Sequence, residues 1–340
     1  MDVFSPSERL MRRFDKKDVD RSPVICPGGM MNSAIVDIMD ATGHTLPAAH
    51  MDGALMADLA EDVMNYTGFE NLGVPFCMTV EAEVLGSEIN FGSLECEPKI
   101  QHERYASAAE VPDFASGLME KAPRVTAIAD AIQRLSRRNP DVPTIGSLTG
   151  PVSTSASIVD PMPFLKQLRR DRNNCHRVLD HVSDQLIEYA GLMVEAGAAA
   201  ISIADPTATG EILGPKMFEE YAVRYLNKVV DAIHGLGVPV IVHICGKMDT
   251  VLPQVALLHA DAISVDAFVS LRKVKDAIPE ATTMGNLSTI TLQFGTEDKV
   301  QRMAEHLIDE KIDILAPACG LSTSTPLKNI QAFTGTVTGG

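Results

Sequence analysis

The sequence predicts a (β/α)8 TIM barrel, an α/β fold in which eight parallel strands alternate with helices. Eight short apolar runs, each ended or interrupted by Gly, Pro, Asp or Asn, alternate with amphipathic stretches, and no linker, repeat or low-complexity segment divides the chain. We therefore expect residues 1–340 to form a single domain. The 45% of hydrophobic residues can fill a large core, and 5% aromatics without Trp suit an α/β protein better than a β-sandwich. A doubly wound open sheet is the alternative, but no G-x-G-x-x-G follows an early strand.

The first helix is predicted from the start of the chain. Ser5 can cap it, Pro6 suits its first position, and Glu8 completes a capping box. Two gaps between strands are longer than one crossover helix. Residues 30–72 have room for extra N-terminal helices, and 87–141 contain a polar inserted hairpin, "SEINFGSLECEPKIQ", and another helix. The last residues, "GTVTGG", are expected to fray.

The strands are expected in eight apolar runs. These are 23–29, 74–86, 142–151, 199–206, 238–246, 262–266, 282–288 and 313–320. Apolar residues with a 3.6-residue period predict helices over 183–197, 214–237 and 297–310.

Charge and composition exclude several classes of function. A net charge of −16 and a pI near 4.9 argue against a nucleic-acid partner, which needs a basic face. The charged start lacks the apolar core of a signal peptide, and no apolar run reaches the roughly 18 residues of a membrane span. Six cysteines are too few for a disulfide framework, so reduced thiols and a cytoplasmic location are expected.

A histidine and a cysteine interrupt the apolar run "PVIVHICG". Side chains alternate along a strand, so His243 and Cys245 point to the same face. Cys319 ends the eighth predicted strand, and in a barrel the carboxyl ends of the strands carry the chemistry. One imidazole and two thiolates are a suitable zinc set. The alternative is a satisfied core histidine with cysteines as small apolar fillers.

Three protein ligands, rather than four, indicate a zinc ion with a position open to substrate. Two thiolates cancel the charge of Zn²⁺, which makes the ion a weak Lewis acid that is better at holding a substrate thiol as thiolate than at generating hydroxide. Coordination lowers the thiol pKa from its ordinary value near 8.5. The set thus predicts thiol activation.

Five stretches resemble the uroporphyrinogen decarboxylase superfamily, in particular its methylcobamide:coenzyme M methyltransferase branch. They are "GVPFCMTVEAEVLGSEINFG", "SIADPTATGEILGP", "VHICG", "MGNLS" and "ACGLSTSTPLKNI". The resemblance implies the barrel, zinc bound through the His-x-Cys…Cys motif, a thiol acceptor such as coenzyme M, and a wide mouth that receives a corrinoid (methylcobamide) carried by a partner protein. Uroporphyrinogen decarboxylases instead hold substrate carboxylates with arginines after the first strand, and no Arg or Lys occurs from Cys26 to Ala34. Gly28 and Gly29 there suit either close approach of a macrocycle or a plain turn.

Other polar residues lie near predicted strand ends. Glu81 and Glu83, two apart in the second predicted strand, would share a face. They could orient His243, supply a fourth ligand or take a proton, or else form a surface rung of an extended hairpin. Asp205 and Asp266 end the fourth and sixth predicted strands, where they could bind substrate, orient a ligand or cap the next helix.

Two further residues are candidates for substrate binding. Asn286 could hold a substrate or corrinoid side chain, and it and Lys247 are the nearest candidates for the sulfonate of coenzyme M. The leading hypothesis is transfer of a methyl group from methyl-Co(III) corrinoid to a zinc-bound thiolate. The alternatives are homocysteine or tetrahydrofolate as acceptor, tetrapyrrole decarboxylation, or a non-catalytic corrinoid-protein partner with a structural zinc. The sequence leaves a homodimer open.

Overall fold

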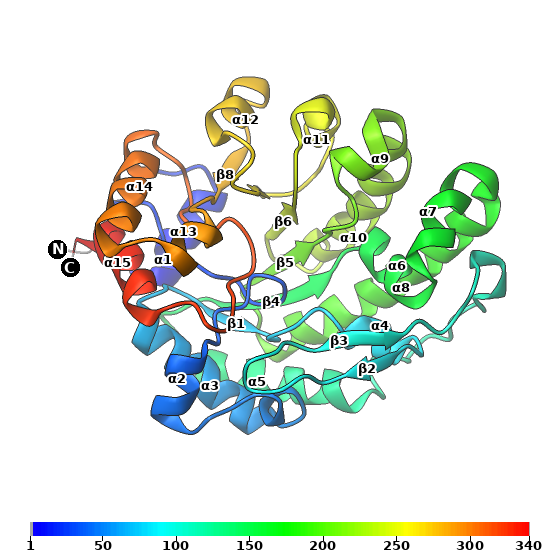
Figure 1. Cartoon of the computed structure of the whole chain (residues 1–340), viewed down its shortest axis with the longest axis horizontal. Coiled ribbons are helices and arrows are strands. Elements are labelled where there is room, and N and C mark those ends of the chain that lie inside the picture. Colours follow the sequence, from blue (N-terminus) through cyan, green and yellow to red (C-terminus); the bar gives the residue numbers. More distant parts are fainter. Residues whose placement is uncertain (1–2, 340) are drawn as a thin grey trace.

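The computed structural model describes residues 3–339 and shows a parallel sheet surrounded by helices (Figure 1). The sheet has six strands in the order β1-β4-β5-β6-β7-β8, and every pair is parallel. The strands are β1 Leu72–Val74, β4 Thr144–Thr149, β5 Ala200–Ala204, β6 Val240–Ile244, β7 Ala262–Val265 and β8 Thr282–Met284.

Two further segments close the sheet into a barrel. Ile314 forms a parallel bridge with the end of β8, and Leu315 forms one with Val24. The seam back to β1 is closed by the side chain of Asn71, which accepts from the Cys26 amide at 2.8 Å and donates to its carbonyl at 3.0 Å. Closure around eight strand positions confirms the TIM barrel and excludes the open doubly wound sheet.

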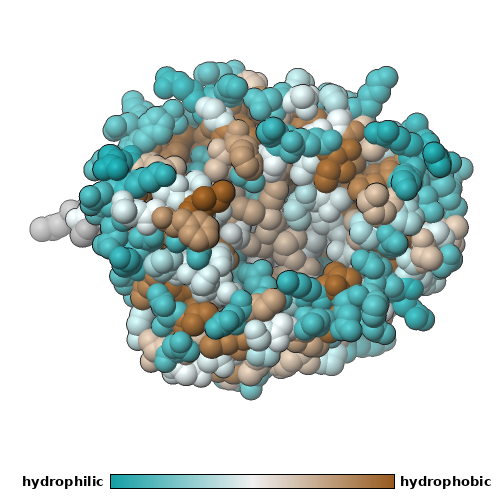
Figure 2. All heavy atoms as spheres, in the orientation of Figure 1, coloured by the Kyte–Doolittle hydropathy of each residue, from teal (hydrophilic) through white to brown (hydrophobic). Residues whose placement is uncertain are grey.

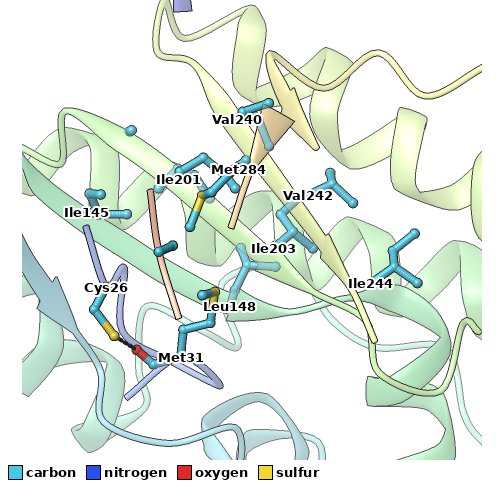
Figure 3. Packing of buried hydrophobic residues seen from close by; sticks show 14 of the residues in the cluster. Cys26, Met31, Ile145, Leu148, Ile201, Ile203, Val240, Val242, Ile244 and Met284 are labelled. Atoms are coloured by element: carbon cyan, nitrogen blue, oxygen red, sulfur yellow. Dashed lines mark hydrogen bonds between the residues drawn. The ribbon is translucent and has the colours of Figure 1, made fainter. Parts of the chain in front are cut away.

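The helices lie outside this ring, and apolar side chains of the strands and helices fill the space between them. Figure 3 shows labelled side chains of β4, β5, β6 and β8, and all of them are buried. The principal helices are α1 Pro6–Phe14, α2 Val36–Thr42, α3 Gly53–Thr67, α4 Val80–Val84, α5 Pro123–Arg138, α6 Pro151–Ile158, α7 Pro161–Arg170, α8 Arg172–Ala196, α9 Gly210–Met217, α10 Arg224–His234, α11 Leu252–Val255, α12 Leu271–Ala277, α13 Thr289–Phe294, α14 Glu297–Asp309 and α15 Leu327–Thr338. Short 3-10 turns occupy Ala48–His50, Ala108–Glu110 and Asp249–Val251, and a π-helix spans Phe218–Val223.

The predicted additions to the barrel are present. Ser5 and Glu8 form the capping box of α1, with hydrogen bonds of 3.2 and 2.9 Å. The N-terminal insertion contains α2 and α3, and an antiparallel hairpin follows α4 (Figure 1). Its strands are β2 Glu88–Asn90 and β3 Lys99–His102. Among the helices described, none has the length and apolar character needed to cross a membrane.

The prediction of one strand over 74–86 is wrong. The strand ends at Val74, and residues 80–84 form the short helix α4. Pro75 cannot donate to a sheet ladder, and in the helix that follows the consecutive residues Val80, Glu81 and Ala82 are all buried. Glu81 and Glu83 therefore do not share a strand face. The expected fraying of the tail is also wrong as far as Thr338, because α15 continues to that residue.

Candidate metal centre

Three predicted ligands meet at the carboxyl ends of two barrel strands. His243 lies in β6, and Cys245 is the first residue after that strand. Cys319 follows the eighth strand segment. His243 Nε2 lies 3.2 Å from Cys245 Sγ, which lies 3.6 Å from Cys319 Sγ. All three donor atoms fall within 4.8 Å of one another.

The geometry of this donor set fits a metal ion. Both cysteines are free thiols. In a tetrahedral zinc site with bonds of about 2.3 Å, two sulfur ligands lie about 3.8 Å apart, close to the separation of Cys245 and Cys319. Within residues 3–339, no carboxylate joins these three donors, so Glu81 is not brought into the set. Histidine, cysteine and carboxylate side chains of the described residues thus supply three of the four ligands of a tetrahedral ion.

The imidazole is held in one orientation. His243 is fully buried, and its Nδ1 lies 2.9 Å from Ser264 Oγ on the neighbouring strand β7. A hydrogen bond at one ring nitrogen directs the other toward a metal. Ser264 is opposite His243 in the β6–β7 register, and sequence reasoning missed it because a single serine in a buried strand carries no signal.

The Cys245 and Cys319 thiols are joined by a hydrogen bond, with their sulfur atoms 3.6 Å apart. The hydrogen bond from Cys245 holds the pKa of the Cys319 thiol below its usual range, against the opposing effect of burial. The same bond, burial and the charges of Asp266 and Asp205 raise the pKa of Cys245. A cation bound by both sulfurs would displace the thiol protons.

Glu81 lies in a buried site of its own. Its side chain is 2% exposed, and Thr149 donates to it through the backbone N–H at 2.6 Å and through Oγ1 at 3.2 Å. Burial raises the pKa of Glu81 to about 7, although these hydrogen bonds oppose the effect. Glu83 instead forms a 2.6 Å ion pair with the buried Arg124. The two carboxylates therefore differ in partner and exposure, and neither is a surface rung.

Asp205 is a capping residue, but not for the helix that follows it. Its carboxylate accepts from the backbone N–H groups of Val152 and Ser153 at 3.0 and 2.8 Å and from Ser153 Oγ at 2.6 Å. It thereby satisfies the N-terminus of α6, which follows the neighbouring strand β4. Burial raises the pKa of Asp205 to about 6, against these hydrogen bonds.

Asp266 and Asn286 line a cavity of about 820 Å³ that also contains Cys319. Asn286 Nδ2 donates to the carbonyls of Asp266 and Val269 at 2.9 and 2.8 Å, so the Asn286 amide hydrogens are occupied. Figure 2 shows a hollow in the middle of this face, with a hydrophobic patch at its rim where Figure 1 places α13. Ile290 and Phe294 of that helix are 68% and 80% exposed.

Lys247 lies outside this cavity lining. Its side chain is 64% exposed, and its Nζ is 3.9 Å from Glu211 Oε1. The backbone N–H of Lys247 also donates to Glu211 Oε2 at 3.3 Å.

A loop at the end of the first strand segment also reaches the cluster. The Cys245 thiol lies 3.7 Å from Met30 Sδ. Sequence reasoning singled out only Gly28 and Gly29 in this loop. A side chain on Gly28 would collide with Gly73, and one on Gly29 would collide with Ser147, so neighbouring protein atoms account for both glycines.

Comparison with known proteins gives the family and supports the fold. The chain is 35% identical to the methylcobamide:CoM methyltransferase MtbA of Methanosarcina acetivorans over 97% of both chains, and 32% identical to MtaA of Methanosarcina barkeri over 98% of this chain and 97% of that one. A solved methyltransferase from Methanosarcina mazei superposes with a TM-score of 0.92 at 30% identity, covering 99% of both chains. A B12-independent methionine synthase from Shewanella, at 14% identity and a TM-score of 0.57, shares the fold. The family model for uroporphyrinogen decarboxylase matches residues 5–339, and the chain belongs to that family.

Proposed function

We propose that this protein is a zinc-dependent methyltransferase. It moves a methyl group from a methylated corrinoid, carried by a partner protein, to a thiol such as coenzyme M. The observation that carries the proposal is the His243, Cys245 and Cys319 cluster at the barrel mouth, which supplies three of the four ligands of a tetrahedral ion. Relatives that cover nearly the whole chain include methylcobamide:CoM methyltransferases, which supports the same donor and acceptor. We take residues 1–340 as one domain and place the reaction in the cytoplasm, where the free thiols stay reduced.

The three residues of the cluster would hold the metal. Bound there, zinc would keep the acceptor sulfur as a nucleophilic thiolate near neutral pH. The residues of the chain would orient the two large reactants and accept the proton that the acceptor thiol loses. Ser264 fixes the imidazole of His243. We assign proton acceptance to Glu81 because it is a buried carboxylate held by Thr149 at the carboxyl end of β4, the end of the barrel that carries the cluster.

The remaining predicted site residues are assigned to binding either the corrinoid or the acceptor. The amide hydrogens of Asn286 are already used, so only its oxygen is open to a ligand. That oxygen suits a donor, such as the side-chain amides of a corrinoid, better than a sulfonate. We assign Asp266, which lines the same cavity, to corrinoid binding together with Asn286. Lys247 remains the candidate cation for an anionic acceptor, although Glu211 competes for it.

Tetrapyrrole decarboxylation has less support. The chain has no Arg or Lys from Cys26 to Ala34 to hold substrate carboxylates. Arg21 precedes the first strand segment and forms a 2.7 Å ion pair with Glu70. That pair lies at the amino end of the barrel, because the Glu70 N–H donates to the carbonyl of Val24.

The test combines metal content with methyl transfer. Zinc-loaded protein should consume methylcobalamin, followed by loss of its methyl–cobalt absorbance, when coenzyme M is added. Homocysteine and tetrahydrofolate are tested in parallel as alternative methyl acceptors. Cys245→Ala should lose most zinc and turnover, whereas Cys175→Ala, a buried cysteine outside the cluster, should keep both. Full zinc occupancy in a Cys245→Ala/Cys319→Ala double variant would refute the site, and transfer to tetrahydrofolate alone would refute the thiol acceptor.

A further inference from the structure

A tight turn after the first strand segment presents one methionine to the metal cluster. Gly28 and Met31 exchange backbone hydrogen bonds of 3.2 and 2.9 Å, so Gly29 and Met30 form the tip. Met30 is half-buried and its Sδ lies 3.7 Å from Cys245 Sγ, whereas Met31 is 1% exposed and packs into the core (Figure 3). The two adjacent methionines therefore have different environments.

Packing fixes the turn on the barrel side. A Cβ on Gly28 would lie 2.8 Å from the carbonyl carbon of Gly73, and one on Gly29 would lie 2.7 Å from Ser147 Cβ. The Gly29 N–H also donates to the carbonyl of Pro75 at 2.6 Å. Strands β1 and β4 thus leave the turn little freedom, and both glycines have positive φ, which other residues adopt only with strain.

The other side of the turn contacts the segment that supplies a metal ligand. A Cβ on Gly320 would lie 2.3 Å from the carbonyl oxygen of Met30. Met30 is therefore held at its backbone beside Cys319 and at its sulfur beside Cys245.

Two of the sulfur–sulfur separations match those within one coordination sphere. Sulfur ligands of a tetrahedral zinc with bonds of about 2.3 Å lie about 3.8 Å apart. The separations from Cys245 Sγ are 3.6 Å to Cys319 Sγ and 3.7 Å to Met30 Sδ. We propose that Met30 Sδ occupies the fourth zinc position when no thiol is bound, and that the acceptor thiol displaces it. This inference rests on the proposed zinc site.

The chemistry of a thioether suits a ligand that is meant to leave. It is neutral and a weak donor, so it keeps water from the metal without adding charge. On exchange, the thiol loses its proton to a base, its sulfur takes the position, and Met30 leaves chemically unchanged. A methylated thiol is itself a thioether. After transfer the product sulfur is therefore no better a donor than Met30, whose return favours product release.

Selenium provides a direct test. Protein grown on selenomethionine and loaded with zinc is measured by X-ray absorption at the zinc edge without thiol. We expect one selenium bound to zinc beside two sulfurs and one nitrogen. Adding the acceptor thiol should remove the selenium signal and raise the sulfur count to three. Met30→Leu should retain one zinc per chain but lose the selenium, while the matched control Met31→Leu should keep it.

The outcomes separate this inference from the proposed function. Zinc-loaded, labelled protein with no selenium bound to zinc overturns the role of Met30, even if methyl transfer to the thiol proceeds normally. Selenium bound to zinc in a protein that transfers no methyl group supports Met30 as a ligand and overturns the methyltransferase. A protein that binds no zinc overturns both.

Discussion

Replacement of Glu81 by glutamine should stabilise the protein in a pH-dependent manner. The folded protein holds the Glu81 proton up to about pH 7, because the site is buried, whereas the unfolded chain loses it near pH 4.5. A folded pKa above the unfolded value means that the stabilising contribution is complete below pH 4.5 and is lost as the pH rises to 7. The interval of 2.5 pH units corresponds to about 3 kcal/mol.

Glutamine is a close mimic of the protonated acid at this site. Its Oε1 can accept from the Thr149 N–H, now 2.6 Å from Glu81 Oε1, and its Nε2 can donate to Thr149 Oγ1, now 3.2 Å from Oε2. The amide does not ionise. The free energy of unfolding of Glu81→Gln minus that of wild type should therefore increase by about 2 kcal/mol from pH 5.5 to 8.5, because 1.5 of the 2.5 pH units fall in this range.

The assay is urea unfolding of zinc-loaded protein at both pH values. Glu83→Gln is the matched control on the same helix. It leaves the buried Arg124 without its 2.6 Å carboxylate partner, so it should be destabilised at both pH values. Parallel curves of unfolding free energy against pH for wild type and Glu81→Gln would show that Glu81 is already ionised at pH 5.5, and would refute the reasoning. The same variant should slow methyl transfer if Glu81 accepts the proton.

Ser264→Ala removes the hydrogen bond that orients the imidazole ligand, and should weaken zinc affinity 10- to 100-fold in a chelator competition while the far-UV circular dichroism stays unchanged. Asp205→Ala leaves the α6 N-terminus without three hydrogen bonds, and should lower the free energy of unfolding by about 3 kcal/mol, measured by denaturation at pH 8. Gly320→Ala places a methyl group against the Met30 carbonyl and should cost about 1–3 kcal/mol; its control Gly191→Ala, with open space around it, should be neutral or slightly stabilising. Equal stability of the two glycine variants would contradict the packing of the turn.

The sequence alone determined the barrel and its three-residue cluster. Strand ends are local features, read from apolar runs and their Gly, Pro and Asp boundaries. In a parallel barrel all those ends lie on one face, which is why His243, Cys245 and Cys319 could be grouped without coordinates. The inserted hairpin and the α1 capping box were predicted for the same reason, since each depends on neighbouring residues.

Only the tertiary structure decided the partners of the other polar residues. The run containing Glu81 alternates like a strand, but tertiary packing makes it a helix and buries this carboxylate against Thr149. Asp205 caps a helix that begins 54 residues earlier in the chain, and the amide of Asn286 is used by the β7–α12 loop. Met30 reaches the cluster across the barrel mouth. These partners are distant in sequence, and hydrogen-bond partners between such segments depend on the register and packing of the closed barrel, which local periodicity does not encode.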